Sequence, residues 1–179
     1  MLETLCIELY YGTIIPYMED CASSENQIRA DNQQGRLHPW YVVGFVDGEG
    51  CFSISIFRNN TTKLGYQVFP EFVVTQGAKS ATVLEDLQSF FDCGRIYENR
   101  RTDNHRENIY RFCVRSVSNI REKVIPFFEH YPLKTNKRLD FEVFCLAVEL
   151  IEKKEHLNPD GLNRLRSLAA TMNRRKPRS

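Results

Sequence analysis

Two acidic residues stand at the end of an apolar segment, WYVVGFVDGEGCF, which spans residues 40–52. Asp47 and Glu49 are two positions apart and are interleaved with Gly48 and Gly50. Carboxylates at the carbonyl end of a helix are unfavourable unless a cation reverses the local charge. Oxygen ligands on a tight glycine turn suit Mg²⁺, which takes one or two protein carboxylates together with phosphate oxygens. The alternative is a plain surface turn capped by glycines, which the same residue types also form.

A pair of glycines precedes these acids at helical spacing. Gly44 and Gly48 are four residues apart, so they share one helix face, although each glycine costs about 1 kcal/mol relative to alanine. This cost indicates a close approach to another helix. If that helix belongs to a second copy, a twofold axis brings two acid pairs together, as in a two-metal phosphodiester site. The predicted dimer interface comprises Val43, Gly44, Asp47 and Gly48.

The hydrophobic periodicity predicts an α+β domain around this segment. Helices are expected at 40–48, 80–91, 120–131, 137–156 and 161–173, and strands at 51–57, 66–76, 95–100 and 109–116. Two hairpins separated by a helix form a mostly antiparallel sheet. Ser80 is the expected cap of the second helix, and Pro70 indicates an edge position or a bulge.

One face of the long helix 137–156 is expected to enter the core. The residues at helical spacing on that face are Leu139, Val143, Leu146 and Leu150.

The sheet is expected to leave one face open. Phe52, Ile54 and Ile56 alternate with serines in the first strand, so the serine side faces outward. An open antiparallel face with polar and basic side chains can enter the major groove of DNA. The predicted DNA-binding residues are Ser53, Ser55, Phe57, Asn59, Gln67, Glu71, Val73, Thr75, Arg95, Tyr97, Asn99, Arg111, Cys113 and Arg115. Candidates for phosphate contacts are Arg58, Lys63, Arg100, Arg101, Arg106, Lys137 and Arg138.

Composition places the chain among ordinary globular proteins. Of its 179 residues, 42% are hydrophobic and 26% are charged, which suits one domain. Residues 1–37 carry six acids and two bases, whereas residues 38–179 carry 17 acids and 22 bases. We therefore divide the chain into an N-terminal extension, 1–37, partly irregular, and a mildly basic domain, 38–179. Six scattered cysteines without a C-x-x-C pair, and no evident secretory signal, favour a reducing, intracellular setting without a membrane span.

A short motif in this domain resembles a known family signature. VVGFVDGEG, residues 42–50, is similar to the nonapeptide of the LAGLIDADG homing endonucleases at the glycines, the apolar positions and both acids. The element order from residue 38 matches the family core, and EHLNPDGLNRLRSLAATMN resembles the C-terminal helix region of single-motif members. The resemblance implies that fold: a saddle-shaped four-stranded antiparallel sheet backed by helices. With one copy of the motif, it also implies a homodimer.

The same resemblance suggests roles for individual residues. Glu49 matches the metal-binding acid, and Asp47 matches the acid that supports the metal site and the helix interface. Gln76, in FVVTQGAKS, matches a glutamine near the attacking water; a polar strand end is the alternative. Lys134, in PLKTNKR, matches a lysine near the scissile phosphate, with Lys137 as the neighbouring candidate and a solvated helix-entry lysine as the alternative. The implied catalytic set is Glu49, Gln76 and Lys134.

These features predict a site-specific double-strand DNA endonuclease encoded in an intron. Family resemblance implies a Mg²⁺ cofactor, for which Mn²⁺ substitutes, a long near-palindromic target and 3′ overhangs. The host compartment is a bacterial or archaeal cytoplasm, a chloroplast or a mitochondrion. Two alternatives share the fold: a maturase that binds its own intron RNA, and a DNA-binding regulator without cleavage. Retention of both acids with Gln76 and Lys134 favours cleavage.

Overall fold

The computed structural model describes residues 37–100 and 108–172. The predicted N-terminal extension, apart from Leu37, lies outside the described residues. The same holds for Arg101 and Arg106, two of the candidates for phosphate contacts.

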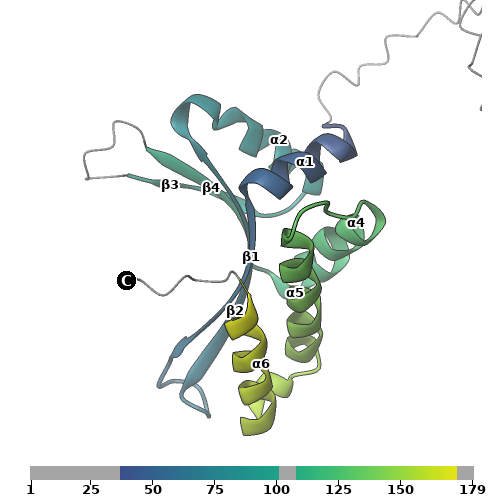
Figure 1. Cartoon of the computed structure of the whole chain (residues 1–179). Helices are drawn as coiled ribbons and strands as arrows, with labels where there is room; N and C mark the ends of the chain where they lie inside the picture. Colours follow the sequence, from purple (N-terminus) through teal and green to yellow (C-terminus); the bar gives the residue numbers. More distant parts are fainter. Residues whose placement is uncertain (1–36, 101–107, 173–179) are drawn as a thin grey trace, which may run out of the picture. The chain divides into compact units, whose positions relative to one another are not determined.

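The described chain forms the predicted α+β arrangement (Figure 1). The motif helix and the sheet comprise α1 (Pro39–Glu49), β1 (Gly50–Arg58), β2 (Tyr66–Gly77), α2 (Thr82–Phe91), β3 (Arg95–Asn99) and β4 (Ile109–Val114). The C-terminal half comprises α3 (Val117–Asn119), a π-helical turn (Ile120–Val124), α4 (Ile125–His130), α5 (Lys137–Glu152) and α6 (Pro159–Thr171). Short 3₁₀ turns lie at Ala78–Ser80 and Glu155–Leu157.

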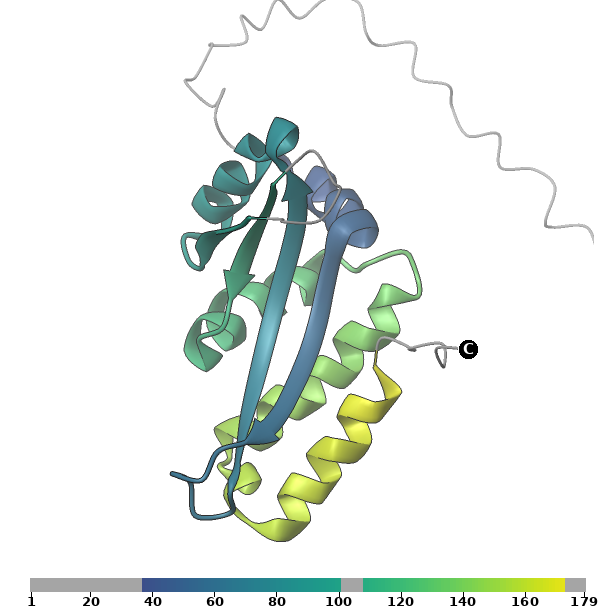
Figure 2. The same ribbon diagram turned by 90° about the vertical axis from the view of Figure 1, so that its left-hand side faces the viewer.

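The four strands form one antiparallel sheet in the order β1-β2-β4-β3. Helices cover one face, and the hairpin ends curve away from them (Figure 1), while Figure 2 looks onto the open face. Pro70 pairs with Ile54 of β1, whereas β4 pairs with β2 only from Phe72 onward. Pro70 therefore lies in a part of β2 that has a single neighbour, which agrees with the predicted edge position.

Aromatic side chains dominate the core between the sheet and the helices. Phe52 of β1 is fully buried, and its ring lies 5.1 to 5.6 Å from those of Phe72, Phe128, Phe141 and Phe144. Such offset and edge-on ring pairs add to the stabilisation from burial alone. These contacts attach β1 to α4 and α5. Because β1 begins directly after α1, they also hold the C-terminal end of α1 in place.

Local signals set the two ends of α1. The His38 imidazole Nδ1 accepts a hydrogen bond from the Trp40 N–H, and Pro39 occupies the first turn, where its missing N–H is harmless. At the other end, the Gly50 N–H donates to the Val46 carbonyl and the chain turns directly into β1. The predicted helix is confirmed with bounds one residue wider at each end.

Two details of the predicted helices are wrong. Ser80 lies inside a 3₁₀ turn, and α2 begins after Ala81 without a side-chain cap. The segment 120–131 is not one regular helix, because Pro126 has no N–H for the helical ladder and a π-helical turn precedes it.

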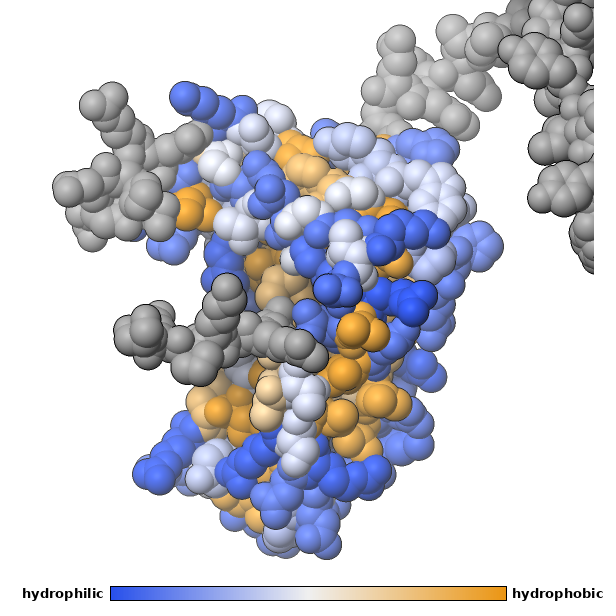
Figure 3. All heavy atoms as spheres, in the orientation of Figure 1, coloured by the Kyte–Doolittle hydropathy of each residue, from blue (hydrophilic) through white to orange (hydrophobic). Residues whose placement is uncertain are grey.

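The core face of α5 also differs from the prediction. Leu139 and Leu146 are more than half exposed, and apolar side chains reach the surface over α5 and α6 (Figure 3). Of the predicted residues, Leu150 is buried and Val143 packs against the core, and the rest of the buried face carries Phe141, Phe144, Ala147, Val148 and Ile151.

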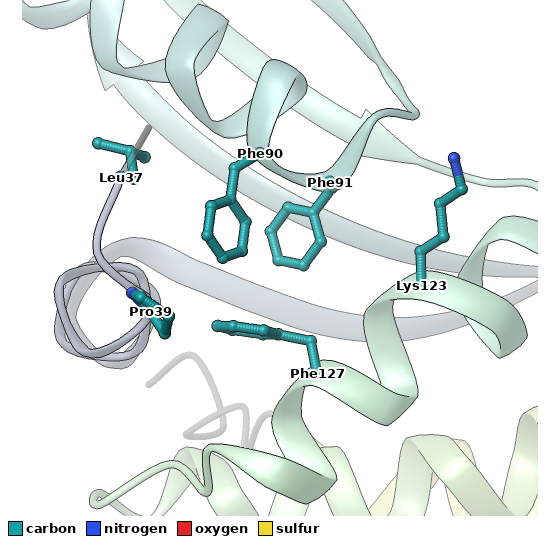
Figure 4. A pocket seen from close by; sticks show the side chains of 6 residues that line it. All are labelled: Leu37, Pro39, Phe90, Phe91, Lys123 and Phe127. Atoms are coloured by element: carbon teal, nitrogen blue, oxygen red, sulfur yellow. The ribbon is translucent and has the colours of Figure 1, made fainter. Parts of the chain in front are cut away.

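A pocket of about 440 Å³ opens beside the start of α1. Phe90, Phe91 and Phe127 form its wall with Pro39, and Lys123 lies at its edge (Figure 4). None of the predicted site residues lines this pocket. In the described part of the chain, no helix has both the length and the apolar character needed to cross a lipid bilayer.

Candidate functional site

The carboxylate of Asp47 is bound to the loop that precedes α5. It accepts hydrogen bonds from the Lys134 N–H at 2.8 Å, the Thr135 N–H at 3.3 Å and the Thr135 hydroxyl at 2.8 Å. The Thr135 hydroxyl oxygen in turn accepts from the Lys137 N–H at 3.2 Å. Asp47 thus holds the loop against α1, while its predicted roles in metal ligation and in the dimer interface stay predictions.

Glu49 has a different environment at the last position of α1. Its side chain is exposed, and no residue of the described ranges 37–100 and 108–172 donates a hydrogen bond to its carboxylate. Within the same ranges, no cluster of three or more His, Cys, Asp or Glu side chains is placed to hold a metal ion. At the end of α1, the described chain therefore presents the exposed carboxylate of Glu49 without further clustered acidic, histidine or cysteine ligands.

Lys137, rather than Lys134, has its ammonium group at the end of α1. Its Nζ donates to the Val46 carbonyl oxygen at 2.8 Å. Burial lowers the pKa of Lys137, while Cys51, Asp47 and Glu49 favour its charged form. The Lys134 ammonium instead lies 5.0 Å from the centre of the Trp40 ring. The predicted lysine contributes its backbone N–H to Asp47, and the neighbouring candidate contributes its charge.

The thiol of Cys51 lies beside this lysine at the start of β1. Burial raises the pKa of Cys51, and the charge of Lys137 only partly opposes that effect. A thiol with a raised pKa stays protonated near neutral pH, so it is a poor nucleophile. Cys51 therefore belongs to the packing around Lys137.

Gln76 lies at the same end of the sheet as the acids. Gly50 pairs with Val74, so Gln76 is two residues further along β2, level with the last turn of α1. It pairs with Tyr110 of β4 and is half-buried. The register therefore places the predicted glutamine on the strand next to Glu49.

The alternation predicted for the open face is confirmed in each strand. Ser53 pairs with Glu71, Thr75 with Arg111 and Tyr97 with Arg111, so these residues share the face opposite the core. Ser55, Phe57, Arg95 and Asn99 follow the same alternation and are exposed.

Four predicted DNA-binding residues are less available than expected. Val73 and Cys113 are only 6% and 3% exposed, because they lie side by side in the centre of the sheet, so they are corrected as base-contacting residues. The Asn59 amide donates to the Gln67 side-chain oxygen at 2.8 Å, and its own oxygen accepts from Thr61. Asn59 thus stabilises the β1–β2 loop, while the Gln67 amide nitrogen remains a donor.

A charged cluster occupies the middle of the open face. Glu71 accepts from Arg111 Nη2 at 3.2 Å and from Arg115 Nε at 2.5 Å. The Arg115 guanidinium also lies 5.0 Å from the centre of the Tyr97 ring and 5.7 Å from that of Phe69. Hydrogen bonding to Glu71 raises the pKa of Arg115 further above its already high usual value.

The small-residue face of α1 is open. A Cβ atom built on Gly44 or Gly48 would meet no described atom within 4 Å, so nothing in the described chain covers that face. Val43 is 2% exposed and packs into the core, so its predicted place in an interface is wrong. Tyr41 is 49% exposed and stacks on Phe45 at the edge of the glycine face.

Three contributors were not predicted from the sequence. Phe69 lies two residues after Gln67 in β2, so the alternation of the strand also assigns it to the open face. The adjacent Pro70 made the alternation there less clear. Tyr41 lies three residues before Gly44 on the same helix face. Thr135 gave no comparable signal, because its contact with Asp47 joins residues 88 positions apart.

Comparisons with known proteins agree with this geometry. Residues 42–148 match the model of the family described as LAGLIDADG endonuclease. A probable intron-encoded endonuclease of Neurospora crassa is 35% identical over 143 residues, which cover 79% of this chain and 26% of that protein. The first three curated relatives are matched over only 26% to 29% of their own length, so the chain spans about a quarter of each.

Two solved homing endonucleases share the fold. I-TnaI superposes with a TM-score of 0.71 at 42% identity, covering 77% of this chain and 89% of that one. I-SmaMI bound to cleaved DNA superposes with a TM-score of 0.72 at 35% identity, covering 78% of this chain and 45% of that one. I-SmaMI has also been crystallised on an uncleaved target in the presence of calcium ions.

Proposed function

Because the chain belongs to the LAGLIDADG endonuclease family, we propose that it is a site-specific double-strand DNA endonuclease that depends on Mg²⁺. One observation carries this proposal: the exposed carboxylate of Glu49 lies at the carbonyl end of α1, where the curved, open sheet face begins. A reactive acid and a DNA-sized surface thus adjoin each other. The names of the relatives support DNA cleavage as the activity.

The donor set at Glu49 fits a hard divalent cation. A carboxylate that accepts no hydrogen bond from the described residues, at the negative end of a helix dipole, favours a bound cation over an unpaired charge. Mg²⁺ bound there would supply positive charge that activates water and stabilises the phosphate in hydrolysis, and Mn²⁺ would substitute for it. We assign Glu49 as the metal-binding residue.

Three other residues support this chemistry in the proposal. Gln76 orients the attacking water from the end of β2. Lys137 holds its ammonium beside the acids and offsets charge that develops on the phosphate. Asp47 fixes the loop from which Lys137 extends. In this proposal Lys137 takes the charge-stabilising role, because the Lys134 ammonium lies over the Trp40 ring instead.

The complete site requires a second set of these residues. We propose that two copies of the chain associate through the open glycine face of α1, each supplying one Glu49. Each copy would then cut one strand of a long, near-palindromic duplex, in a staggered manner that leaves 3′ overhangs. An intron location for the gene follows from the relatives named as intron-encoded.

The deciding experiment offers the purified protein, and the Glu49→Gln variant beside it, a pool of randomised duplexes with Mg²⁺ or EDTA. Bound and cut fractions are sequenced separately. The proposal predicts metal-dependent cutting at one near-palindrome, lost in Glu49→Gln while binding persists. Specific binding without cutting under Mg²⁺ or Mn²⁺ would instead indicate a regulator. Binding to the host intron RNA, with no DNA consensus, would indicate a maturase.

A further inference from the structure

Glu71 joins two arginines on the open face of the sheet. Its two carboxylate oxygens bond to different arginines: Oε2 accepts from Arg111 Nη2, and Oε1 accepts from Arg115 Nε. The Glu71 side chain is 16% exposed, whereas those of Arg111 and Arg115 are 38% and 40% exposed. The carboxylate therefore lies beneath the two guanidinium groups, which face outward.

Aromatic rings hold one of these arginines in place. The Arg115 guanidinium lies against Tyr97 of β3 and Phe69 of β2, at 5.0 and 5.7 Å from the ring centres. With its Nε bound to Glu71, its terminal Nη1 and Nη2 donors remain at the end of the fork. A pocket of about 300 Å³, lined by Arg95, Tyr97 and Arg115 among others, opens beside it.

This arrangement suits base recognition better than phosphate binding. A guanidinium fork pairs with the O6 and N7 atoms of guanine, which is the commonest specific contact in the major groove. The carboxylate and the stacked rings already restrict the rotamers of the arginine side chain. The side chain therefore loses less conformational entropy when it binds a base. A phosphate contact gains less from a fixed orientation, because it carries no sequence information.

We propose that Arg111 and Arg115 each read a guanine in the target, and that Glu71 is a positioning residue rather than a base reader. Both oxygens of Glu71 bond to arginines, and its side chain is only 16% exposed beneath them, so the guanidinium groups rather than the carboxylate face a base edge. Since both guanidinium groups bond to one carboxylate, the two guanines lie in adjacent or next-but-one base pairs, at a rise of roughly 3.4 Å per pair. The inference rests on the proposed DNA endonuclease function.

Charge provides a second readout. The cluster carries two positive charges and one negative charge, and Glu71→Gln removes the negative one without changing its shape. The variant should bind random DNA more tightly at low salt and lose affinity more steeply as salt rises. If Glu71 had only a structural role, Glu71→Gln would not both weaken the preference for guanine and steepen the salt dependence of binding.

The experiment selects targets from randomised duplexes with four full-length proteins: the unmodified chain, Glu71→Gln, Arg115→Lys and Glu152→Gln. Glu152 is the control, because it lies on α5, away from the open face, and pairs with Arg121 of the π-helical turn at 3.2 Å. The unmodified chain should prefer guanine at two neighbouring positions of each half-site by roughly 5- to 150-fold over other bases. Glu71→Gln should flatten both positions, Arg115→Lys should flatten one, and Glu152→Gln should change neither.

Each other outcome counts against the inference. An unchanged profile in Glu71→Gln, or a consensus without paired guanines, overturns it while leaving the endonuclease proposal intact. An unmodified chain that selects no DNA overturns the proposed function and this inference together. If Glu71→Gln fails to fold, as judged by its thermal transition, Arg115→Lys carries the test, since it keeps the charge but lacks the fork.

Discussion

Two lysines three residues apart have different environments in this protein. Lys134 precedes α5, and its ammonium group stacks over Trp40. Lys137 is the first residue of α5 and extends toward the last turn of α1, where it caps the Val46 carbonyl. Because Lys134 lies in the loop and Lys137 in the first turn of α5, their side chains point in different directions. A motif spanning both residues cannot distinguish them, since the distinction arises from the tertiary contact.

Removing the Lys137 charge should affect cleavage and spare binding. We expect Lys137→Met to lower the rate of DNA cleavage about 10²- to 10³-fold, because a positioned charge at the reacting phosphate is lost. The fold should persist, since the Gly50 N–H still donates to the Val46 carbonyl. Single-turnover cleavage and a binding titration on the selected duplex measure the two effects. Lys134→Met is the matched control; a larger loss in that variant would return the catalytic role to Lys134.

His156 makes the stability of the fold depend on pH. Burial lowers the pKa of its imidazole, and its Nδ1 atom is buried without a hydrogen-bond partner in the described structure. Below the usual value of about 6.5, the unfolded chain takes up a proton before the folded chain does, so the free energy of unfolding falls as pH falls.

Urea denaturation between pH 7 and pH 5 tests this prediction. The unmodified chain should lose stability across that window, and His156→Gln should lose less, because it has no group to protonate there. Both proteins share every carboxylate, so the difference between their curves isolates the imidazole. Identical slopes for the two proteins would show that another group causes the loss.

At the level of single residues, the sequence predicts kinds of side chain better than their partners. Alternation placed Glu71 and Arg111 on the open face, as the strand register confirms, while Arg115 follows the end of β4 and joins that face through its bond to Glu71. Their mutual bonds join residues 40 and 44 positions apart, and no periodic signal spans such distances. Asp47 illustrates the same limit, since its hydrogen-bond partners lie 87 and 88 residues away.

The junction of α1 and β1 is the structural element on which the site depends. The helix ends and the strand begins without a connecting loop, and Gly50 makes that turn. A Cβ atom on Gly50 would lie 2.5 Å from Val46 Cγ1 and 2.8 Å from the Val46 carbonyl oxygen. That oxygen also accepts the Lys137 ammonium, so a displaced turn would move the lysine as well.

Gly50→Ala should therefore lower both stability and activity. We expect a loss of about 1–3 kcal/mol in the free energy of unfolding, as for overpacked cores, measured by urea denaturation. Cleavage should fall further than the unfolded fraction explains, because Lys137 loses its anchor. Gly44→Ala is the control for stability alone, measured at a concentration where the chains are dissociated, since its Cβ meets nothing within 4 Å in the described chain. Equal stabilities for the two variants would contradict the close contact at Gly50.

Elements were predicted well where one signal dominated. β1 alternates strictly over Phe52, Ile54 and Ile56, and α1 carries both Pro39 and Gly50 as boundaries. α5 is apolar on more than one side, so its helical spacing alone was consistent with two different buried faces. The core accepted the face with Phe141 and Phe144, whose rings pack on Phe52, and left Leu139 and Leu146 outside.

At the scale of the whole molecule, the open face of α1 decides whether a second unit of the fold can pack beside Glu49. Gly44 and Gly48 let a second helix approach closely, and they lie five residues and one residue before Glu49. The chain covers 89% of I-TnaI but 45% of I-SmaMI, which is roughly one half of the latter. A second unit of the same fold against this face would bring two carboxylates together, since each α1 ends in one.

Substituting both glycines should separate folding from association. In the isolated chain, Gly44→Ala with Gly48→Ala should raise the free energy of unfolding by up to about 2 kcal/mol, because alanine favours a helix by about 1 kcal/mol per site. The added methyl groups should also hold a second helix away, so the double variant should dissociate at concentrations where the unmodified chain is a dimer. Sedimentation velocity over a dilution series measures association, and urea denaturation at the lowest concentration measures stability, which avoids the contribution of dimerisation. Tighter folding with weaker association and lost double-strand cleavage would support the shared site. A double variant that associates and cuts as before would show that the copies meet elsewhere and that Glu49 acts within one chain.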